Sequence, residues 1–194
     1  MEHVLTDYTG EHHTFAYQYD CFEPQELNTL QEIARSAQDP GLVGPGSLGT
    51  VSDNVRRSNL KWVHNSRETL WIYHKLSHHV SNLNSRFFQF KLTGFGEALQ
   101  FTNYNSTDHG MYNWHVDFGG ICSRKLSIVL QLSDPADYEG GSLQLNTGNS
   151  EIITIEKRRG MLVAFPSWTL HQVTPVTQGT RQSLVAWLTG PRFA

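Results

Sequence analysis

The sequence predicts a mainly β fold, a double-stranded β-helix of the jelly-roll, cupin-like type, with about two helices buttressing one outer face. Two observations carry this prediction. Apolar residues recur at helical spacing in the first half of the chain. From about residue 87 onward the chain instead consists of short β-rich runs, separated by turn signals such as Asp134-Pro135 and Gly140-Gly141. Short strands at this spacing are typical of closed or double-sheet antiparallel structures, which can enclose a small ligand.

Length and composition favour a single domain. The chain has 194 residues, of which 38% are hydrophobic, enough to bury one core but not a second full domain. We expect one domain over residues 1–194, with a helical and mixed part over about 1–86 and a jelly-roll core over about 87–190.

The charge balance limits the possible partners. The formal net charge is −3 and the pI is near 6.3, so the chain lacks the basic surface typical of nucleic-acid-binding proteins. No apolar run is long enough to span a membrane, and MEHVLTDYTGEHH lacks the basic-then-apolar order of a secretory signal. We therefore expect a cytoplasmic protein without nucleic-acid or membrane partners. The distant Cys21 and Cys122 favour reduced, structural thiols.

The first expected helix covers FEPQELNTLQEIARSAQ, residues 22–38. Pro24 suits its first position, Leu27, Leu30 and Ala34 recur at helical spacing, and Asp39-Pro40 should end it. The glycine-rich segment 40–50 follows. It lacks the Gly-Lys-Ser/Thr ending of a phosphate-binding loop, so we interpret it as either an exposed connector or a mobile flap over a site.

A second helix is expected from about Ser66, a suitable N-cap. Its apolar stripe comprises Leu70, Tyr73, Val80, Leu83 and Phe87. His74, His78 and His79 lie along the same helix, and histidines four apart can share a metal ion. Because the glutamate of an H-E-x-x-H motif is missing, a polar helix face is the favoured interpretation.

Eight runs from residue 87 onward have strand composition. They read FFQFKL, ALQFTNYN, KLSIVLQLS, GSLQL, EIITIE, GMLVAFP, LHQVTPV and RQSLVAWL.

The stretch YNWHVDFGG contains a candidate pair of metal ligands. His115 and Asp117 are two residues apart, and residues two apart on a strand project from the same face. His171, in FPSWTLHQVTPV, is the best candidate for a third ligand. Two histidines and one carboxylate form the facial triad of non-haem Fe(II) oxygenases, which leaves metal positions open for other ligands.

A candidate carboxylate-binding residue follows the third ligand. Arg181 stands ten residues after His171, beyond the turn at Gln178-Gly179. A guanidinium group is well suited to bind a carboxylate at two points. The alternative is a surface arginine, although the flanking TRQSLVAWL has the character of a buried strand.

The motifs HVD, SDPADYEGG and LVAFPSWTLHQVTPVTQGTR, in this order, resemble the Fe(II)/2-oxoglutarate-dependent dioxygenases, in particular their prolyl 4-hydroxylase-like and PKHD-type branch. The resemblance covers about residues 99–190. It implies that His115, Asp117 and His171 bind iron, and that Arg181 binds the distal carboxylate of 2-oxoglutarate. It also implies Fe(II) as the cofactor, 2-oxoglutarate and dioxygen as co-substrates, and ascorbate as a reductant.

Two further residues acquire expected roles from the same resemblance. Tyr104 stands where relatives often carry a tyrosine that hydrogen-bonds the co-substrate, and the alternative is an ordinary core aromatic. Ser183, two residues after Arg181, could add a hydroxyl to the same carboxylate. On the strand after the H-x-D motif this chain reads SIVLQL, so it lacks the second carboxylate-binding tyrosine of some prolyl hydroxylases.

The function implied by the resemblance is hydroxylation of an unactivated C–H bond. A prolyl residue in a peptide or protein is the first candidate, and a free amino acid or small metabolite is the second. Tyr112, Trp114, Phe118 and Trp168 are either walls for this substrate or ordinary barrel packing. Two other classes stay open: a redox-inert metal-dependent jelly-roll enzyme, since zinc accepts the same ligands, and a non-catalytic binding module.

Overall fold

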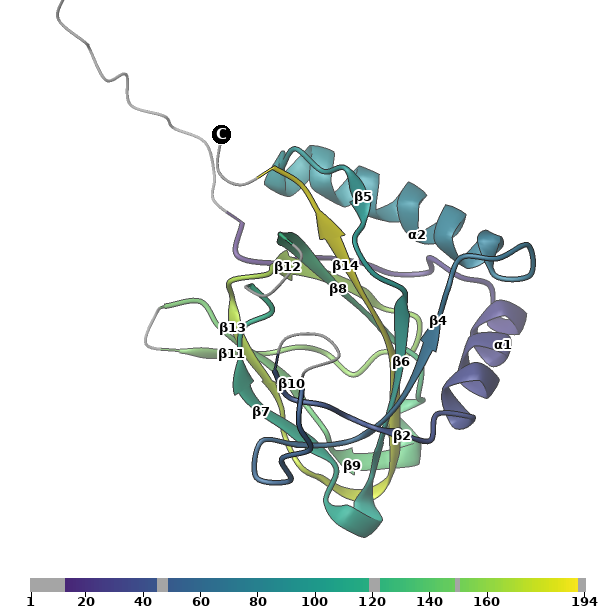
Figure 1. Cartoon of the computed structure of the whole chain (residues 1–194), viewed down its shortest axis with the longest axis vertical. Helices are drawn as coiled ribbons and strands as arrows, with labels where there is room; N and C mark the ends of the chain where they lie inside the picture. Colours follow the sequence, from purple (N-terminus) through teal and green to yellow (C-terminus); the bar gives the residue numbers. More distant parts are fainter. Residues whose placement is uncertain (1–12, 45–48, 119–122, 149–150, 192–194) are drawn as a thin grey trace, which may run out of the picture.

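The computed structural model describes residues 13–44, 49–118, 123–148 and 151–191. Over these ranges the chain forms two antiparallel sheets that face each other, with two helices outside one of them (Figure 1). The prediction of a mainly β jelly roll with two buttressing helices is therefore confirmed.

The two sheets differ in size. The larger, here the major sheet, runs in the spatial order β1 (Ala16–Gln18), β12 (Leu162–Pro166), β8 (Arg124–Gln131), β14 (Val176–Thr189), β6 (Leu99–Asn105), β4 (Asn59–Val63) and β2 (Asp39–Pro40), and β5 (Gly94–Phe95) and β9 (Tyr138–Gly140) pair with β14. The minor sheet runs in the order β11 (Ile152–Thr154), β10 (Leu143–Asn146), β13 (Leu170–Val173), β7 (Met111–His115) and β3 (Arg56–Arg57). Short 3-10 turns cover Ser106–Asp108 and Pro135–Asp137.

The first helix, α1, agrees with its prediction. It covers Pro24–Arg35, with the proline in its first turn. A capping box closes its beginning, because the Glu23 N–H donates to the Glu26 carboxylate at 2.7 Å and the Glu23 side chain accepts in return. The helix ends before Asp39. Its apolar face packs on the major sheet through Leu27, Leu30 and Ala34.

The second helix, α2, begins later than predicted. It covers Leu70–Leu83 with Thr69 as the N-cap, so the assignment of Ser66 as N-cap was wrong. Ser66 instead opens a turn, because its carbonyl accepts from the Leu70 N–H at 2.9 Å and its own N–H donates to the Thr69 hydroxyl at 2.9 Å. Leu70 is 39% exposed and lies off the buried stripe, to which Tyr73 and Val80 do belong.

The run FFQFKL is not a strand. The chain continues from α2 into a π-helical turn, η2 (Asn84–Phe88). The Asn84 side chain then closes the turn, accepting from the Phe90 N–H at 3.0 Å and donating to the Phe90 carbonyl at 2.9 Å. These aromatic side chains pack against the core cluster beneath the helices rather than joining a sheet. The other seven predicted runs each contain a strand.

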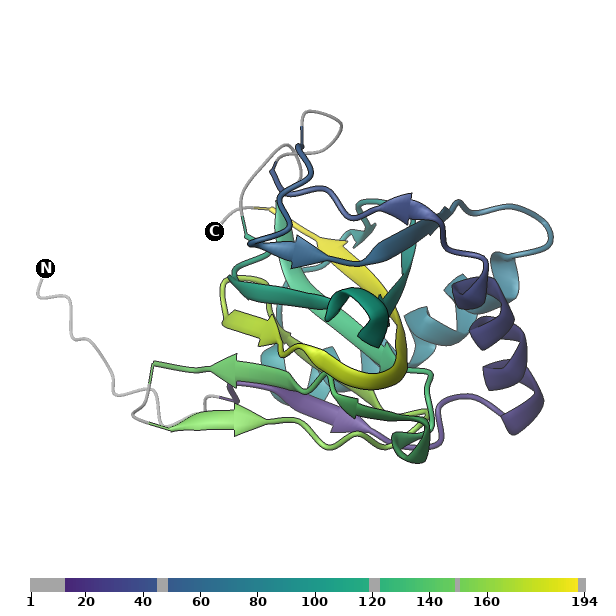
Figure 2. The same ribbon diagram turned by 90° about the horizontal axis from the view of Figure 1, so that it is seen from below.

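The major sheet has two different faces. Its outer face lies under α1 and α2, which Figure 2 shows on the side of the molecule away from β10 and β11. Alternate residues of β6, β8 and β14 form this outer core, among them Phe101, Ile128 and Leu184, each 0% exposed. The residues between them point into the barrel. Sequence alternation thus separates a packed face from a cavity-lining face.

Candidate metal centre and active site

The structure brings His115, Asp117 and His171 together. Strands β7 and β13 are neighbours in the minor sheet, and His115 and His171 are directly opposite each other. Asp117 lies in the loop just after β7, where its N–H donates to the Ser167 carbonyl at 2.9 Å. The expectation of one shared strand is therefore corrected: β7 ends at His115. The three side chains still converge, with ligand atoms within 4.8 Å of one another.

The hydrogen bonds of the two histidines orient their free nitrogens toward Asp117. Nδ1 of His115 lies 2.7 Å from the Asn113 carbonyl, and Nδ1 of His171 lies 2.9 Å from the Thr169 carbonyl. A carbonyl only accepts, so each Nδ1 carries the proton and each Nε2 presents a lone pair. The Nε2 atoms lie 3.8 and 3.6 Å from the Asp117 carboxylate oxygens.

This donor set fits a divalent metal ion. Two neutral imidazole nitrogens and one carboxylate oxygen, with histidines held by backbone carbonyls, form a preorganised centre of the 2-His-1-carboxylate type. The Asp117 carboxylate also accepts from the Ser127 hydroxyl at 2.7 Å. Within the described part of the chain, these residues are the one group of three or more metal-binding side chains. His74 and His78 are exposed on α2 and His79 is half-buried, and their interpretation as a polar helix face stays a prediction.

Electrostatics keep His115 and Asp117 in the protonation states that metal binding requires. Burial, and next the charge of His171, lower the pKa of His115 to about 3. Burial alone would raise the pKa of Asp117, but the adjacent histidines and the Ser127 hydrogen bond outweigh it and lower that pKa. At neutral pH the centre therefore offers a neutral His115 and an ionised carboxylate.

Arg181 lies at the deep end of the same barrel and is only 1% exposed. Its Nη2 donates to Gln131 Oε1 at 2.9 Å, its Nη1 donates to the Ser183 hydroxyl at 3.3 Å, and its Nε has no partner among the described residues. Its contacts are neutral, including the Tyr104 ring, which lies 5.4 Å from the guanidinium carbon. A buried cation without a counter-ion is costly. The site is therefore suited to an anionic ligand.

Tyr104 and Ser183 lie beside Arg181 on the inner side of the major sheet. Tyr104 is 3% exposed and is directly opposite Arg181 in the β6–β14 pairing, and Ser183 is 1% exposed. Both line the same cavity as the three metal-binding side chains. Gly179, two residues before Arg181, has φ of 69°, and a Cβ there would lie 2.0 Å from the Asp137 carbonyl oxygen. Only glycine fits this corner of the barrel.

Sequence reasoning missed two residues at the Arg181 end. Gln131 stands in the SIVLQL run, and its Oε1 accepts a hydrogen bond from the Arg181 guanidinium. The signal was available, since Gln131 shares the inward parity of Ser127 and Val129 on β8. The second residue that sequence reasoning missed is Tyr138 of β9. Burial raises its pKa, while Arg181 opposes that shift.

A cavity of about 630 Å³ joins both groups of residues. It extends from Arg181 past the metal-binding side chains to a mouth lined by Trp62, Glu97, Arg124 and Trp187. At the mouth Arg124 makes a two-point ion pair with Glu97, with both N–O distances 2.7 Å, and stacks on Trp187 at 3.9 Å. Sequence reasoning did not identify these mouth residues or Arg56 as candidate site residues, because no motif contains them.

The four predicted wall aromatics separate into three situations. Tyr112 lines the cavity and stacks on His115 with ring centroids 3.5 Å apart. Trp114 is half-buried and does not line the cavity. Phe118 and Trp168 are 45% and 39% exposed and meet edge to face at 6.3 Å, beside the ligand Asp117.

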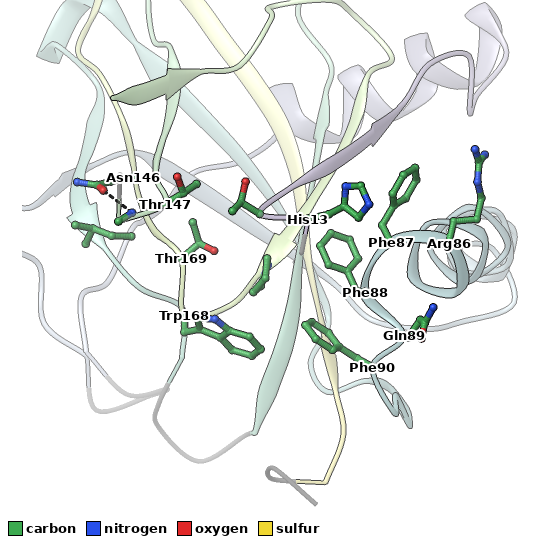
Figure 3. A pocket seen from close by; sticks show the side chains of 14 residues that line it. His13, Arg86, Phe87, Phe88, Gln89, Phe90, Asn146, Thr147, Trp168 and Thr169 are labelled. Atoms are coloured by element: carbon green, nitrogen blue, oxygen red, sulfur yellow. Dashed lines mark hydrogen bonds between the residues drawn. The ribbon is translucent and has the colours of Figure 1, made fainter. Parts of the chain in front are cut away.

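A second hollow of about 900 Å³ shares no lining residue with this cavity. Figure 3 shows Phe88, Phe90 and Trp168 grouped on one side of it. The Phe90 and Trp168 rings lie 5.4 Å apart. Because Trp168 also contacts Phe118, the residue after Asp117, aromatic rings extend from this hollow to the loop that carries Asp117.

Only part of the glycine-rich segment is described, since residues 45–48 lie outside the described ranges. Its beginning is held on β3–β4 by the Gly41 N–H, which donates to the Ser58 carbonyl at 2.8 Å, and Leu42 and Gly44 line the cavity. Cys122 also lies outside the described residues. Burial raises the pKa of the Cys21 thiol to about 12, which fits a structural role. None of the described helices is long and apolar enough to cross a membrane.

The sequence of this chain is similar to members of one protein family. Residues 99–189 match the model of the 2OG-Fe(II) oxygenase superfamily. A PKHD-type hydroxylase of Nitrosomonas europaea is 32% identical over 172 residues, covering 84% of this chain and 72% of that protein. A PKHD-type hydroxylase of Synechococcus sp. (strain CC9605) is 44% identical over 79 residues, covering 40% of this chain and 36% of that protein. The chain thus spans about a third of the length of some of the curated relatives that it matches.

Solved structures resemble the fold. A prolyl hydroxylase from Trichoplax adhaerens, in complex with a hypoxia inducible factor peptide, superposes with a TM-score of 0.75 at 15% identity, covering 91% of this chain and 83% of that one. A prolyl-4-hydroxylase of Pseudomonas putida superposes with a TM-score of 0.70 at 20% identity, covering 93% and 94%. At these identities the likeness concerns the fold alone.

Proposed function

The chain belongs to the 2OG-Fe(II) oxygenase superfamily, and from this premise we propose that it is an Fe(II)- and 2-oxoglutarate-dependent dioxygenase that hydroxylates an unactivated C–H bond. One observation carries the proposal. A triad of two histidines and an aspartate, half-buried at His115 and Asp117 and buried at His171, shares a cavity with Arg181, a fully buried cation whose partners among the described residues are neutral. A metal ion and a dianionic 2-oxo acid would satisfy both groups at once.

Each residue has a task in this proposal. Bound Fe(II) would supply the activation of dioxygen, coupled to the oxidative decarboxylation of 2-oxoglutarate to succinate and carbon dioxide. His115, Asp117 and His171 hold the metal on one face. Arg181 pairs with the distal carboxylate, while Gln131 and Ser183 fix the orientation of its guanidinium. Tyr104 offers its hydroxyl group to the co-substrate.

For the substrate, we propose a prolyl residue in a peptide or protein. The titles of the similar solved structures name prolyl hydroxylases, one of them with a bound peptide. The exposed rings of Phe118 and Trp168, with the aromatic hollow beyond them, offer contact surface outside the cavity that a free amino acid would not reach. A free amino acid or small metabolite is the second candidate. The reason is Arg56, a second buried arginine that lines the cavity together with the metal-binding side chains.

The test is succinate production from 2-oxoglutarate by the purified, Fe(II)-loaded protein under air. Proline-containing peptides, free amino acids and a no-substrate control are compared, each with and without ascorbate. Stimulation by peptides supports the prolyl proposal, whereas stimulation by amino acids alone selects the second candidate. A protein that binds the metal but not 2-oxoglutarate would contradict the oxygenase proposal and favour a redox-inert metal site.

A further inference from the structure

Arg56 is a second buried cation in the active-site cavity. It lies on β3, directly opposite Tyr112 of β7, and is only 6% exposed. Its guanidinium carbon lies 4.5 Å from the centroid of the Tyr112 ring, which in turn stacks on His115 at 3.5 Å. Only one aromatic ring therefore separates this cation from a metal-binding side chain.

The protein holds the Arg56 guanidinium in a fixed position. Its Nε donates to the Ser58 hydroxyl at 2.8 Å and its Nη2 donates to Gln100 Oε1 at 2.9 Å. Gly41 packs against it, because a Cβ at residue 41 would lie 2.6 Å from Nε. Preorganisation of this kind is typical of a side chain that binds a ligand rather than one that is solvated.

No carboxylate of the described residues forms an ion pair with Arg56, and its Nη1 makes no hydrogen bond to them. Its two side-chain acceptors, Ser58 and Gln100, are neutral. Arg124, in the same cavity, differs from Arg56 in this respect, because its charge is neutralised by the two-point contact with Glu97. A buried cation without an anion is expensive, so a stable site of this kind normally acquires one from its ligand.

The proposed cofactor and co-substrate do not supply that anion. The two charges of Fe(II) and the charge of Arg181 are balanced by Asp117 and the two carboxylates of 2-oxoglutarate. Arg124 and Glu97 balance each other at the mouth. Asp39 also lines the cavity, but it is exposed and forms no ion pair with Arg56 within the described part of the chain. The buried Arg56 guanidinium therefore has no paired anion there, and the substrate is the component still to enter.

We propose that Arg56 binds a carboxylate carried by the substrate, close to the carbon that is hydroxylated. This inference rests on the proposed function. The carboxylate comes either from a small organic acid or from an acidic side chain beside the target residue of a peptide. A guanidinium with a free Nη1 matches this group in both geometry and charge.

The test compares each acid with its amide, because the two differ by one charge. The pairs are proline and prolinamide for a free acid, and the C-terminally amidated peptides Gly-Pro-Asp-amide and Gly-Pro-Asn-amide for an acidic side chain. Dissociation constants are measured by calorimetry on the full chain loaded with Mn(II) in place of Fe(II), so that no turnover occurs, with and without 2-oxoglutarate. We expect at least one acid to bind tenfold or more tightly than its amide, and the pair that does so identifies the source.

Three variants assign the preference to one side chain. Arg56→Gln should abolish the preference and leave the affinity for 2-oxoglutarate unchanged. Arg56→Lys, which keeps the charge without the planar fork, should retain part of it. Arg57→Gln is the matched control, because Arg57 donates to the backbone carbonyls of Asp53 and His109 and does not line the cavity.

Three outcomes would overturn the inference: no acid preferred over its amide by the wild-type protein, a preference that persists in Arg56→Gln, or a loss of 2-oxoglutarate affinity in that variant. The last would assign Arg56 to the co-substrate. Failure of the wild-type protein to bind 2-oxoglutarate would instead contradict the proposed function, and the comparison made without 2-oxoglutarate still tests Arg56.

Discussion

The two faces of the major sheet are equally buried but chemically opposite. On β6, β8 and β14 the outward residues are almost all aliphatic or aromatic, such as Phe101 and Leu130, each 0% exposed. Their inward neighbours include Gln131, Arg181 and Ser183, exposed by 2% or less. Burial of apolar side chains stabilises the fold, whereas burial of polar and charged groups costs free energy unless each has a partner. Stability and ligand binding are thus assigned to alternate residues of the same strands.

This comparison predicts that substitutions of residues that line the cavity and of residues on the outer face have separable effects. The largest effect is expected from Asp117→Ala. It removes the one anionic metal ligand, so Fe(II) affinity should fall by more than the roughly 10–100-fold that loss of an outer-shell partner costs, and succinate formation should stop. Metal content and succinate are measured together, with exposed Asp108→Ala as the control. Unchanged turnover in Asp117→Ala would contradict the assignment of His115, Asp117 and His171 as the metal ligands.

The second largest effect is expected from Arg181→Met. This substitution should weaken the binding of 2-oxoglutarate but should not lower the stability of the ligand-free protein. Loss of the partner of a buried carboxylate costs about 3–5 kcal/mol, so 2-oxoglutarate affinity should fall at least a hundredfold while metal binding is spared. Without ligands, replacing an unpaired buried cation by an apolar side chain of similar volume should leave the protein equally or more stable. Calorimetric titration and thermal melting measure the two effects. The exposed Arg158→Met should change neither, and a retained affinity in Arg181→Met would move the co-substrate anchor elsewhere.

The outer face should behave in the reverse way. Leu130→Ala leaves a cavity in the core beneath the helices and should lower the free energy of unfolding by about 2–5 kcal/mol. Its neighbour Gln131 keeps its place on the inner face, so 2-oxoglutarate should bind the folded variant with wild-type affinity. Denaturant unfolding and titration at low temperature check both statements. A large loss of affinity here would show that the two faces are not independent.

The smallest effect is expected from His79 of α2. Its Nδ1 is buried and has no hydrogen-bond partner in the part of the chain that the structure describes. Burial, followed by the nearby His78, lowers the pKa of His79. The unfolded chain then binds a proton more readily than the folded one. The stability contribution of this neutral histidine is therefore present above about pH 6.5, the pKa in the unfolded chain, and is lost as the pH falls below it.

His79→Gln should accordingly reduce the fall in melting temperature between pH 7.5 and about 5.5. His74 lies on the same helix but is exposed, so His74→Gln should leave the fall unchanged. An identical pH dependence in the wild type and in His79→Gln would mean that burial does not lower the pKa of His79.

The same alternation explains what could be read from the sequence. The longer strands β6, β8 and β14 can be predicted from their β-rich runs. The spacing of His115 and Asp117, together with His171, predicts a cluster that the structure confirms. The strands β1, β2, β3 and β5 have only two or three residues each, too few for any periodicity. FFQFKL has strand composition, but the Asn84 side chain directs it into a turn.

Gln131 and Arg56 could not be found by motif, because their significance depends on contacts with residues far away in the sequence. Gln131 reaches Arg181, and Arg56 reaches Gln100. Neither pairing follows from local spacing. Only the pairing of β8 with β14 and of β3 with β7 places these side chains inside the barrel.

The most direct test of the central claim is an anaerobic titration of the wild-type protein with Fe(II) and then 2-oxoglutarate, followed by visible absorption. If the cavity holds both, the charge-transfer band of an Fe(II)–2-oxo acid chelate should develop with one equivalent of each. It should be absent in Asp117→Ala and need far more 2-oxoglutarate in Arg181→Met. Stoichiometric Fe(II) binding by the wild type without this band at any 2-oxoglutarate concentration would contradict the account.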